Sequence, residues 1–156
     1  MVNSDVIKRE GSCEVFYIRQ HLTCKSTNVV YVVRCKRCDR LGVGECLLPK
    51  KRLMDYVRAA GKMTLTTTSA VEKHFLDCPL HDERDLEFTL VDALPLGCKP
   101  ACWDSERSRL EEIWIAKLHP SLNIKKQVRN SFTGFARARL PPAIDDLIAT
   151  LSQSQG

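Results

Sequence analysis

Residues 29–47 read VVYVVRCKRCDRLGVGECL, and this stretch decides the fold. It holds two short apolar runs, Val29 to Arg34 and Leu41 to Leu47, on either side of a polar segment. Runs of this length that are rich in β-branched residues are typical of buried strands, and a short polar connection favours a hairpin. The stretch therefore predicts a two-stranded hairpin with Cys35 and Cys38 in its loop.

The residues after the hairpin predict two helices. Pro49 suits the first turn of a helix, because its fixed φ is already helical. Apolar residues at positions 53, 57 and 60 give this helix one buried face before Gly61 ends it. The threonines at 64–68 are placed to cap a second helix, which carries Val71 and Phe75 and stops near Pro79.

A third strand and a last helix follow. Residues 86–91 place leucine, phenylalanine and leucine at alternate positions, which predicts a strand. Residues 95–103 contain two prolines, a glycine and two cysteines, which indicates a loop. Asp104 or Ser105 is expected to cap a helix that runs to about Leu118. The residues spaced for its buried face are Leu110, Ile113, Trp114 and Lys117.

This order of elements predicts a small α/β protein, an α+β sandwich in which helices flank a three-stranded antiparallel or mixed sheet. The chain of 156 residues has room for one such domain with a core. We expect the domain to span residues 24–126. Residues 1–23 would form an N-terminal extension, with no regular signal beyond a short apolar stretch at 15–18. Residues 127–156 would form a basic and then amphipathic tail.

Composition excludes some classes of protein. No apolar run approaches the ~20 residues of a membrane span, and the N-terminus lacks the apolar core of a signal peptide. We therefore expect no membrane partner and an intracellular location. The formal charge of +5 permits a polyanionic partner without requiring one.

The eight cysteines point to metal chemistry. Without a secretory signal, a Cys-x-x-Cys pair indicates a metal site or a redox pair rather than a disulfide framework. A redox pair should open a helix after a strand, which lowers the pKa of its first thiol. Cys35 and Cys38 instead follow a strand and precede another one, and a hairpin loop favours a zinc knuckle.

Six landmarks in order resemble the GIY-YIG nuclease family. Val29-Val30-Tyr31 lies where the family has Gly-Ile-Tyr, and Gly42-Val43-Gly44 lies where it has Tyr-Ile-Gly. The remaining matches are Arg52 to the helix arginine, Tyr56 to the aromatic or histidine one turn later, Glu111 to the metal-binding glutamate, and Asn123 to the asparagine that closes the domain.

A narrower resemblance is to the GIY-YIG domains of Penelope-like retroelements, which carry two cysteines between the motifs and two histidines further on. The corresponding residues here are Cys35, Cys38, His74 and His81. They would form a structural Cys₂His₂ zinc site, since a tetrahedral site can take two thiolates from one turn and two imidazoles from a second segment. Cys24 and Cys78 are competing ligands.

The resemblance implies a DNA endonuclease of retroelement origin, located in the nucleus, with Tyr31, Arg52, Tyr56 and Glu111 as catalytic residues. Glu111 would hold a catalytic Mg²⁺ or Mn²⁺ ion, because carboxylate oxygens suit ions that keep several waters. Arg52 would neutralise charge on the phosphate, and the tyrosines would orient or deprotonate water. DNA would also contact the basic residues Lys50, Lys51, Lys125 and Lys126, and an inactive fold that binds nucleic acid would use Arg52 and Arg129 as well.

One departure from the family pattern is Gly42, which stands where the second motif has tyrosine. This removes a water-positioning hydroxyl, so a weakened or inactive enzyme is expected, and Gly42→Tyr is expected to raise activity without a folding penalty. Two alternatives remain open: an inactive GIY-YIG fold that binds nucleic acid, and a zinc-stabilised module for protein interaction.

Overall fold

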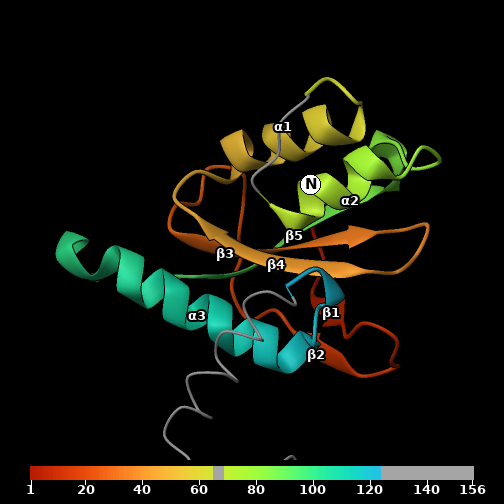
Figure 1. Cartoon of the computed structure of the whole chain (residues 1–156). Helices are drawn as coiled ribbons and strands as arrows, with labels where there is room; N and C mark the ends of the chain where they lie inside the picture. The colour runs from red at the N-terminus through yellow and green to blue at the C-terminus, as the bar shows by residue number, and fades with distance from the viewer. Residues whose placement is uncertain (65–68, 124–156) are drawn as a thin grey trace, which may run out of the picture. The chain divides into compact units, whose positions relative to one another are not determined.

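The structure is a computed structural model, and it describes residues 1–64 and 69–123. Its centre is an antiparallel sheet of three strands in the order β4-β3-β5, formed by Leu41–Cys46, Val29–Cys35 and Leu86–Ala93 respectively. Helices lie on both sides of this sheet (Figure 1). The predicted α+β fold, the hairpin and the third strand are confirmed. The tail at 127–156 lies outside the described residues.

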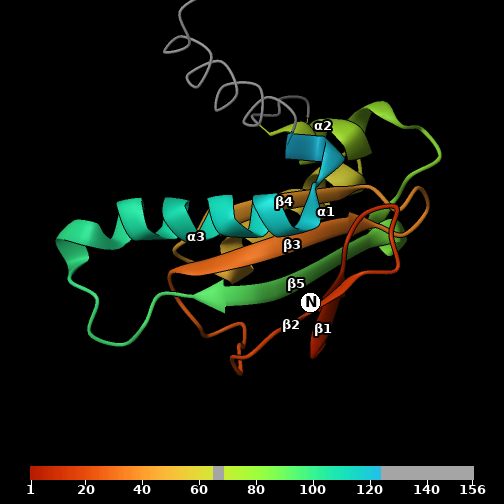
Figure 2. The same ribbon diagram turned by 90° about the horizontal axis from the view of Figure 1, so that it is seen from below.

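Three helices form the outer layers. The helices α1 (Pro49–Ala60) and α2 (Ala70–Asp77) lie over one face of the sheet, and α3 (Trp103–Leu118) lies along the other (Figures 1 and 2). Short 3₁₀ turns occupy Glu83–Asp85, Pro100–Cys102 and Ser121–Asn123. None of the helices in the described part of the chain has the length and apolar character needed to cross a membrane.

The central strand β3 is buried from Val29 to Val33, where helices cover both of its faces. Tyr31 and Val33 point into the core under α1 and α2, together with Phe75 and Phe88. Val30 and Val32 point into a second core under α3, which is built on Trp114, Ile115 and Leu118. Side chains alternate between faces along a strand, so the run from Val29 to Val33 supplies both cores.

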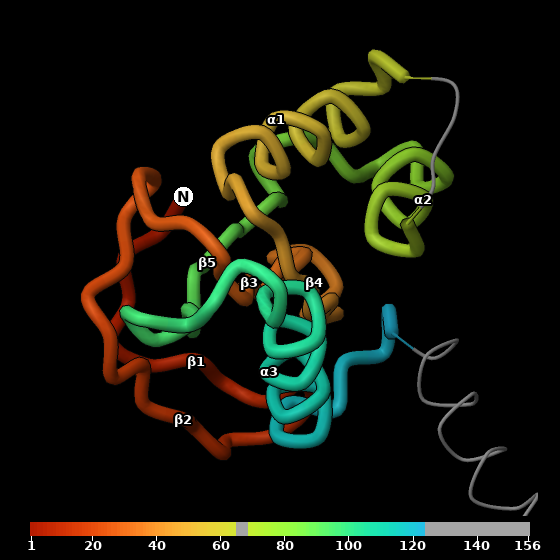
Figure 3. Tube along the Cα trace, turned by 90° about the vertical axis from the view of Figure 1, so that its left-hand side faces the viewer, coloured from red at the N-terminus to blue at the C-terminus, as the bar shows by residue number. Residues whose placement is uncertain are grey.

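An additional hairpin precedes the predicted domain. Strands β1 (Val6–Lys8) and β2 (Val15–Tyr17) pair antiparallel beside α3, where Ile7 and Phe16 join the second core (Figure 3). Residues 1–123 form one compact unit, so this segment belongs with the sheet and helices. The apolar stretch at 15–18 overlaps β2, but strands of three residues are too short to show the alternating pattern that would predict a hairpin.

Two helix starts differ from the predictions. Helix α2 is capped by Ser69, whose Oγ accepts a hydrogen bond of 3.1 Å from Glu72 N, while the threonines at 65–68 lie outside the described residues. Helix α3 begins at Trp103, before the predicted caps, because it continues directly from a 3₁₀ turn and has no side-chain cap. Ile113 was predicted to be buried but is 39% exposed, and Ile115 is buried in the core instead.

The outer edge of β4 is covered by side chains from both ends of the unit. Asn123 accepts a bond from Val43 N and donates one to Val43 O, each of 2.8 Å. Glu10 accepts bonds from Leu41 N at 2.7 Å and from Ser121 N at 2.9 Å. These side chains bind backbone groups of β4 that a neighbouring strand would otherwise bind. They therefore hinder pairing of this edge with a strand of another chain.

Candidate functional site

Two tyrosines and an arginine form a hydrogen-bonded cluster between β3 and α1. The hydroxyl oxygens of Tyr31 and Tyr56 lie 2.8 Å apart, and Arg52 Nε donates to the Tyr31 hydroxyl at 3.1 Å. The guanidinium carbon of Arg52 lies 5.0 Å from the centre of the Tyr56 ring, a cation–π distance. The structure thus brings together three of the four residues predicted as catalytic.

Local features of the backbone position this cluster. Arg52 and Tyr56 are four residues apart on α1, so their side chains share one face of the helix. A β-bulge in the pairing of β3 with β5 falls between Val30 and Tyr31. Tyr31 is paired with Gly44 on β4, and a Cβ at Gly44 would overlap the Tyr31 ring and hydroxyl. Gly44 is therefore required for Tyr31 to lie where it does.

Carboxylates neutralise the guanidinium of the cluster. Arg52 Nη1 lies 3.4 Å from Glu72 Oε1 and 3.9 Å from Asp55 Oδ2. The Glu72 side chain is 9% exposed, whereas that of Arg52 is 30% exposed, so the arginine is the member of the pair that reaches solvent. Sequence analysis missed Glu72, although Ser69-x-x-Glu72 is a recognisable start of a helix.

Burial keeps both phenols protonated. Burial, together with the neighbouring Tyr56, raises the pKa of Tyr31 well above its ordinary value of 10.0, and Arg52 only partly opposes this. Burial likewise raises the pKa of Tyr56. The tyrosines are thus suited to orienting a neighbouring group by hydrogen bonds rather than to accepting a proton as phenolates.

Gly42 lies on the same face of β4 as Gly44 and beneath α2. A Cβ at Gly42 would overlap the Cγ2 methyl of Val71, the second residue of that helix. The space for a side chain at position 42 is therefore occupied. The expectation that tyrosine would be accepted here without a folding penalty is wrong, because α2 packs directly on the glycine.

Glu111, the fourth predicted catalytic residue, lies on α3 and is 4% exposed. Arg107, one turn earlier on the same face of that helix, donates to Glu45 Oε2 on β4 and to Asn28 Oδ1, each at 2.6 Å. The Cys46 thiol on β4 is near both Arg107 and Arg52; burial, reinforced by Glu45, raises its pKa to about 11 despite the opposing effect of these cations. This end of β4 is thus approached by basic residues of α1 and of α3.

The predicted DNA-binding lysines are only partly described. Lys50 and Lys51 are exposed in the first turn of α1, directly before Arg52. Lys125, Lys126 and Arg129 lie outside the described residues. A basic surface at the start of α1 is therefore present.

Four predicted ligands form a group that could bind a metal ion: Cys35, Cys38, His74 and His81. Their ligand atoms all lie within 4.8 Å of one another. Cys35 ends β3, Cys38 lies in the hairpin loop, His74 lies on α2 and His81 follows that helix. The fold thus brings two thiols from one turn to two imidazoles from a second segment.

The spacing within this group suits a tetrahedral ion. Cys35 Sγ lies 3.7 Å from His81 Nδ1, and Cys38 Sγ lies 3.4 Å from His74 Nε2. Ligands on a tetrahedral zinc ion, with bonds of about 2.3 Å to sulfur and 2.0 Å to nitrogen, would be about 3.6 Å apart. In the described part of the chain, neither Cys24 nor Cys78 joins the group, and all eight cysteines are free of disulfides.

Burial favours the uncharged forms of two of these ligands, Cys35 and His74. Burial raises the pKa of the Cys35 thiol. Burial and the neighbouring His81 lower the pKa of His74, which favours its neutral, metal-binding form. An ion entering the site would displace the thiol protons.

Comparisons of this chain with protein-family models, with curated proteins and with solved structures find no match.

Proposed function

We propose that the protein is a metal-dependent DNA endonuclease of the GIY-YIG type, of retroelement origin and closest to the domains of Penelope-like elements. The observation that carries the proposal is the cluster of Tyr31, Tyr56 and Arg52, in which two phenols and a guanidinium from β3 and α1 converge. A guanidinium fixed in this way can present its free N–H groups to phosphate oxygens.

Two further contacts support the resemblance. Asn123, which matches the asparagine that closes the family's domain, binds both backbone groups of Val43 in the edge strand. The four residues that match the retroelement cysteines and histidines share one site. Both features depend on contacts between residues far apart in the sequence, and for this reason they support the proposal.

The reaction is hydrolysis of a phosphodiester. A water molecule adds to phosphorus, the bond from phosphorus to the leaving oxygen breaks, and the water's proton passes through solvent to that oxygen. The products are a phosphate monoester and a free hydroxyl. Arg52 binds the phosphate through the side of its guanidinium that reaches solvent, and Tyr31 and Tyr56 hold the guanidinium and orient groups beside it.

Glu111 is the residue that would hold the catalytic Mg²⁺ or Mn²⁺ ion. Arg107, one turn before Glu111 on the same face of α3, forms an ion pair with Glu45 of β4. Glu45 is next to Gly44, and Gly44 is paired with Tyr31 of the cluster. A single carboxylate suits Mg²⁺, which keeps several waters and takes few protein ligands. When bound, the ion would stabilise negative charge on the phosphate and the leaving oxygen.

The Cys₂His₂ group would hold a structural zinc ion. Four protein ligands leave no open position for substrate or water, which is typical of a structural rather than a catalytic site. The ion would connect the β3–β4 hairpin to α2 and the segment that follows it. It would thereby fix α2, which carries Val71 and the Glu72 partner of Arg52.

A second candidate is an inactive fold that binds nucleic acid without cleaving it. Two observations favour it: Val71 occupies the space that a tyrosine at position 42 would need, and Glu72 already pairs with Arg52. In this case Arg52, Lys50 and Lys51 would contact phosphates, and added Mg²⁺ would not lead to cleavage.

The test compares Arg52 with an arginine outside both the cluster and the basic surface at the start of α1. Arg52→Ala should lower the rate of plasmid cleavage in Mg²⁺ by about 100-fold or more, as expected when a positioned charge donor is lost. Arg84→Ala removes an exposed arginine that pairs with Asp82 and should leave the rate within about threefold. Absence of cleavage by the wild type, with DNA binding retained, would favour the second candidate.

A further inference from the structure

A groove runs beside the N-terminal end of α1, outside the tyrosine–arginine cluster. It encloses about 750 Å³, and its lining comes from the segment before β3 and from the start of α1. The lining residues are Cys24, Lys25, Ser26, Leu48, Pro49, Lys50, Lys51, Met54, Asp55 and Arg58. The groove therefore extends the basic surface at the start of α1 to the segment before β3.

The rim of the groove is basic. Lys25, Lys50 and Lys51 are exposed along it, and the ion pairs of the described residues include none of the three. The acidic residue in the lining is Asp55, which pairs with Arg58 at 3.7 Å and with Arg52 at 3.9 Å. The acid is thus neutralised, and three lysines remain to attract an anion.

The helix end adds to this positive charge. Leu48 is the N-cap of α1 and provides no side-chain cap, and the first turn contains no acidic residue. The first N–H groups of the helix are therefore left for an anionic partner, and the helix dipole favours the same charge.

The floor of the groove is apolar. Leu48 is 51% exposed and Met54 is 44% exposed, and Pro49 lies between them in the sequence. The side chains of Leu48 and Met54 cannot donate hydrogen bonds to phosphate oxygens. They can pack against the flat face of an unpaired base. A duplex keeps its bases stacked inside and presents mainly phosphates to such a surface.

We propose that this groove binds a single-stranded segment of DNA, with its phosphates on the three lysines and an unpaired base against Leu48 and Met54. This deepens the proposed function, on which it rests, by assigning the substrate as DNA with an unpaired segment next to Arg52. The three lysines favour an anionic occupant over a basic one, and the apolar floor favours a single strand over a duplex.

Equilibrium binding tests the proposal without cleavage. A labelled single-stranded oligonucleotide and its duplex are titrated with the zinc-loaded protein by fluorescence anisotropy, with no added Mg²⁺. The single strand should bind about fivefold tighter or more. Lys50→Ala and Lys51→Ala should each lower the slope of log K against log salt by about 1. Equal affinity for duplex and single strand would overturn the proposal.

The apolar floor has a matched control. Met54→Ser should weaken single-strand binding about fivefold with an unchanged salt slope, because it removes contact with a base rather than with a phosphate. Met63→Ser changes a methionine that is 71% exposed and lies outside the groove, so it should have no effect. Equal affinities for these two variants, both folded by circular dichroism, would also overturn the proposal.

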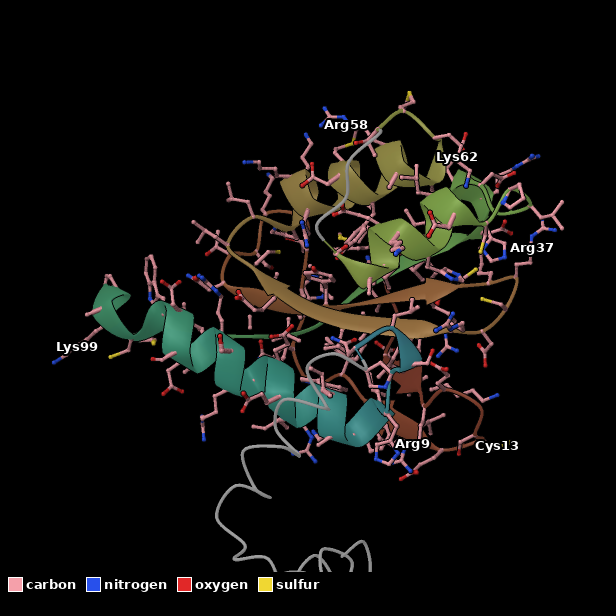
Figure 4. All side chains as sticks on the ribbon, in the orientation of Figure 1. Arg9, Cys13, Arg37, Arg58, Lys62 and Lys99 are labelled. Atoms are coloured by element: carbon pink, nitrogen blue, oxygen red, sulfur yellow. The ribbon has the colours of Figure 1, made fainter. Side chains whose placement is uncertain are left out.

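Coupling to a thiol in the lining of the groove tests where the bound oligonucleotide lies. Cys24 is exposed in the groove, whereas Cys13 is exposed in the β1–β2 hairpin, on the other side of the sheet from Arg58 (Figure 4). An oligonucleotide with an activated disulfide on one base should couple to Cys24 rather than to Cys13, and Cys24→Ser should abolish coupling. Coupling at Cys13 instead would contradict the proposal.

These outcomes separate the inference from the proposed function. Cleavage of duplex DNA without any preference for single strands would overturn the groove assignment and leave the nuclease proposal intact. Preferential single-strand binding that depends on Met54, without cleavage in Mg²⁺, would support the groove and contradict the nuclease.

Discussion

The Cγ2 methyl of Val71 occupies the space into which a side chain at Gly42 would extend. This contact sets α2 directly on the edge strand β4. It also explains why glycine stands where the resemblance puts a tyrosine, since no larger residue fits unless α2 moves. Two tyrosines are nevertheless present in the cluster, one from β3 and one from α1.

Gly42→Ala should therefore destabilise the protein by overpacking. We expect a loss of about 1–3 kcal/mol in the free energy of unfolding, because Val71 is β-branched and its methyl cannot rotate away freely. Urea denaturation measures the change. In a Val71→Ala background the same substitution should cost at least about 1 kcal/mol less. Equal costs in both backgrounds would show that the two residues are not in conflict.

Zinc should be bound in about one equivalent per chain and should stabilise the fold, since a site of four ligands forms only in the folded state. Cys38→Ser should abolish binding and lower the melting temperature. Cys13→Ser changes another exposed thiol, outside the site, and should do neither. Elemental analysis and thermal denaturation, with and without a chelator, measure both effects. A wild type that melts at the same temperature with and without the chelator would contradict a structural role.

Tyr31 should make the protein sensitive to alkaline pH. Burial raises the pKa of Tyr31 in the folded state above 10.0, so the unfolded chain loses this proton first as pH rises. The stabilisation is fully present below pH 10 and is lost progressively above it.

Tyr31→Phe tests this dependence. The variant should be less stable at pH 7 by about 1–3 kcal/mol, because it leaves Arg52 and Tyr56 without their buried partner. Its stability should also fall less steeply than that of the wild type between pH 10 and 11.5. Parallel pH profiles for the two proteins, from urea denaturation, would contradict the assignment.

Much of the fold could be predicted from the sequence. The valine-rich run and the short polar loop are strong local signals, and they predict the hairpin that holds Tyr31, Cys35 and Cys38. The N-terminal hairpin gave no such signal. The start of α3 predicted from capping residues is later than the observed start. The helix follows directly from a 3₁₀ turn and has no side-chain cap.

The sequence predicts only those parts of the site that local pattern determines. Residue type and order pointed to Arg52 and Tyr56, but the Glu72 partner and the overlap of Val71 with position 42 depend on how α2 packs against α1 and β4. Such contacts between distant segments follow from tertiary packing and not from local pattern.

Asn123→Ala should loosen the edge of the sheet. The substitution removes both hydrogen bonds to Val43, and a buried backbone N–H left without a partner costs about 1–3 kcal/mol. Hydrogen exchange at the Val43 amide should accelerate, while the amide of Val32 in the central strand should change only with global stability. Equal acceleration at both positions would show that Asn123 does not act locally.

The central claim is tested most directly by plasmid cleavage in Mg²⁺ with two neighbouring glutamates of α3 changed in turn. Glu111 is buried and Glu112 is exposed, so the pair forms a matched comparison. The wild type and Glu112→Gln should cleave at similar rates, however slow. Glu111→Gln should show no metal-dependent cleavage while retaining zinc and its fold. Cleavage by Glu111→Gln at the wild-type rate would contradict the account.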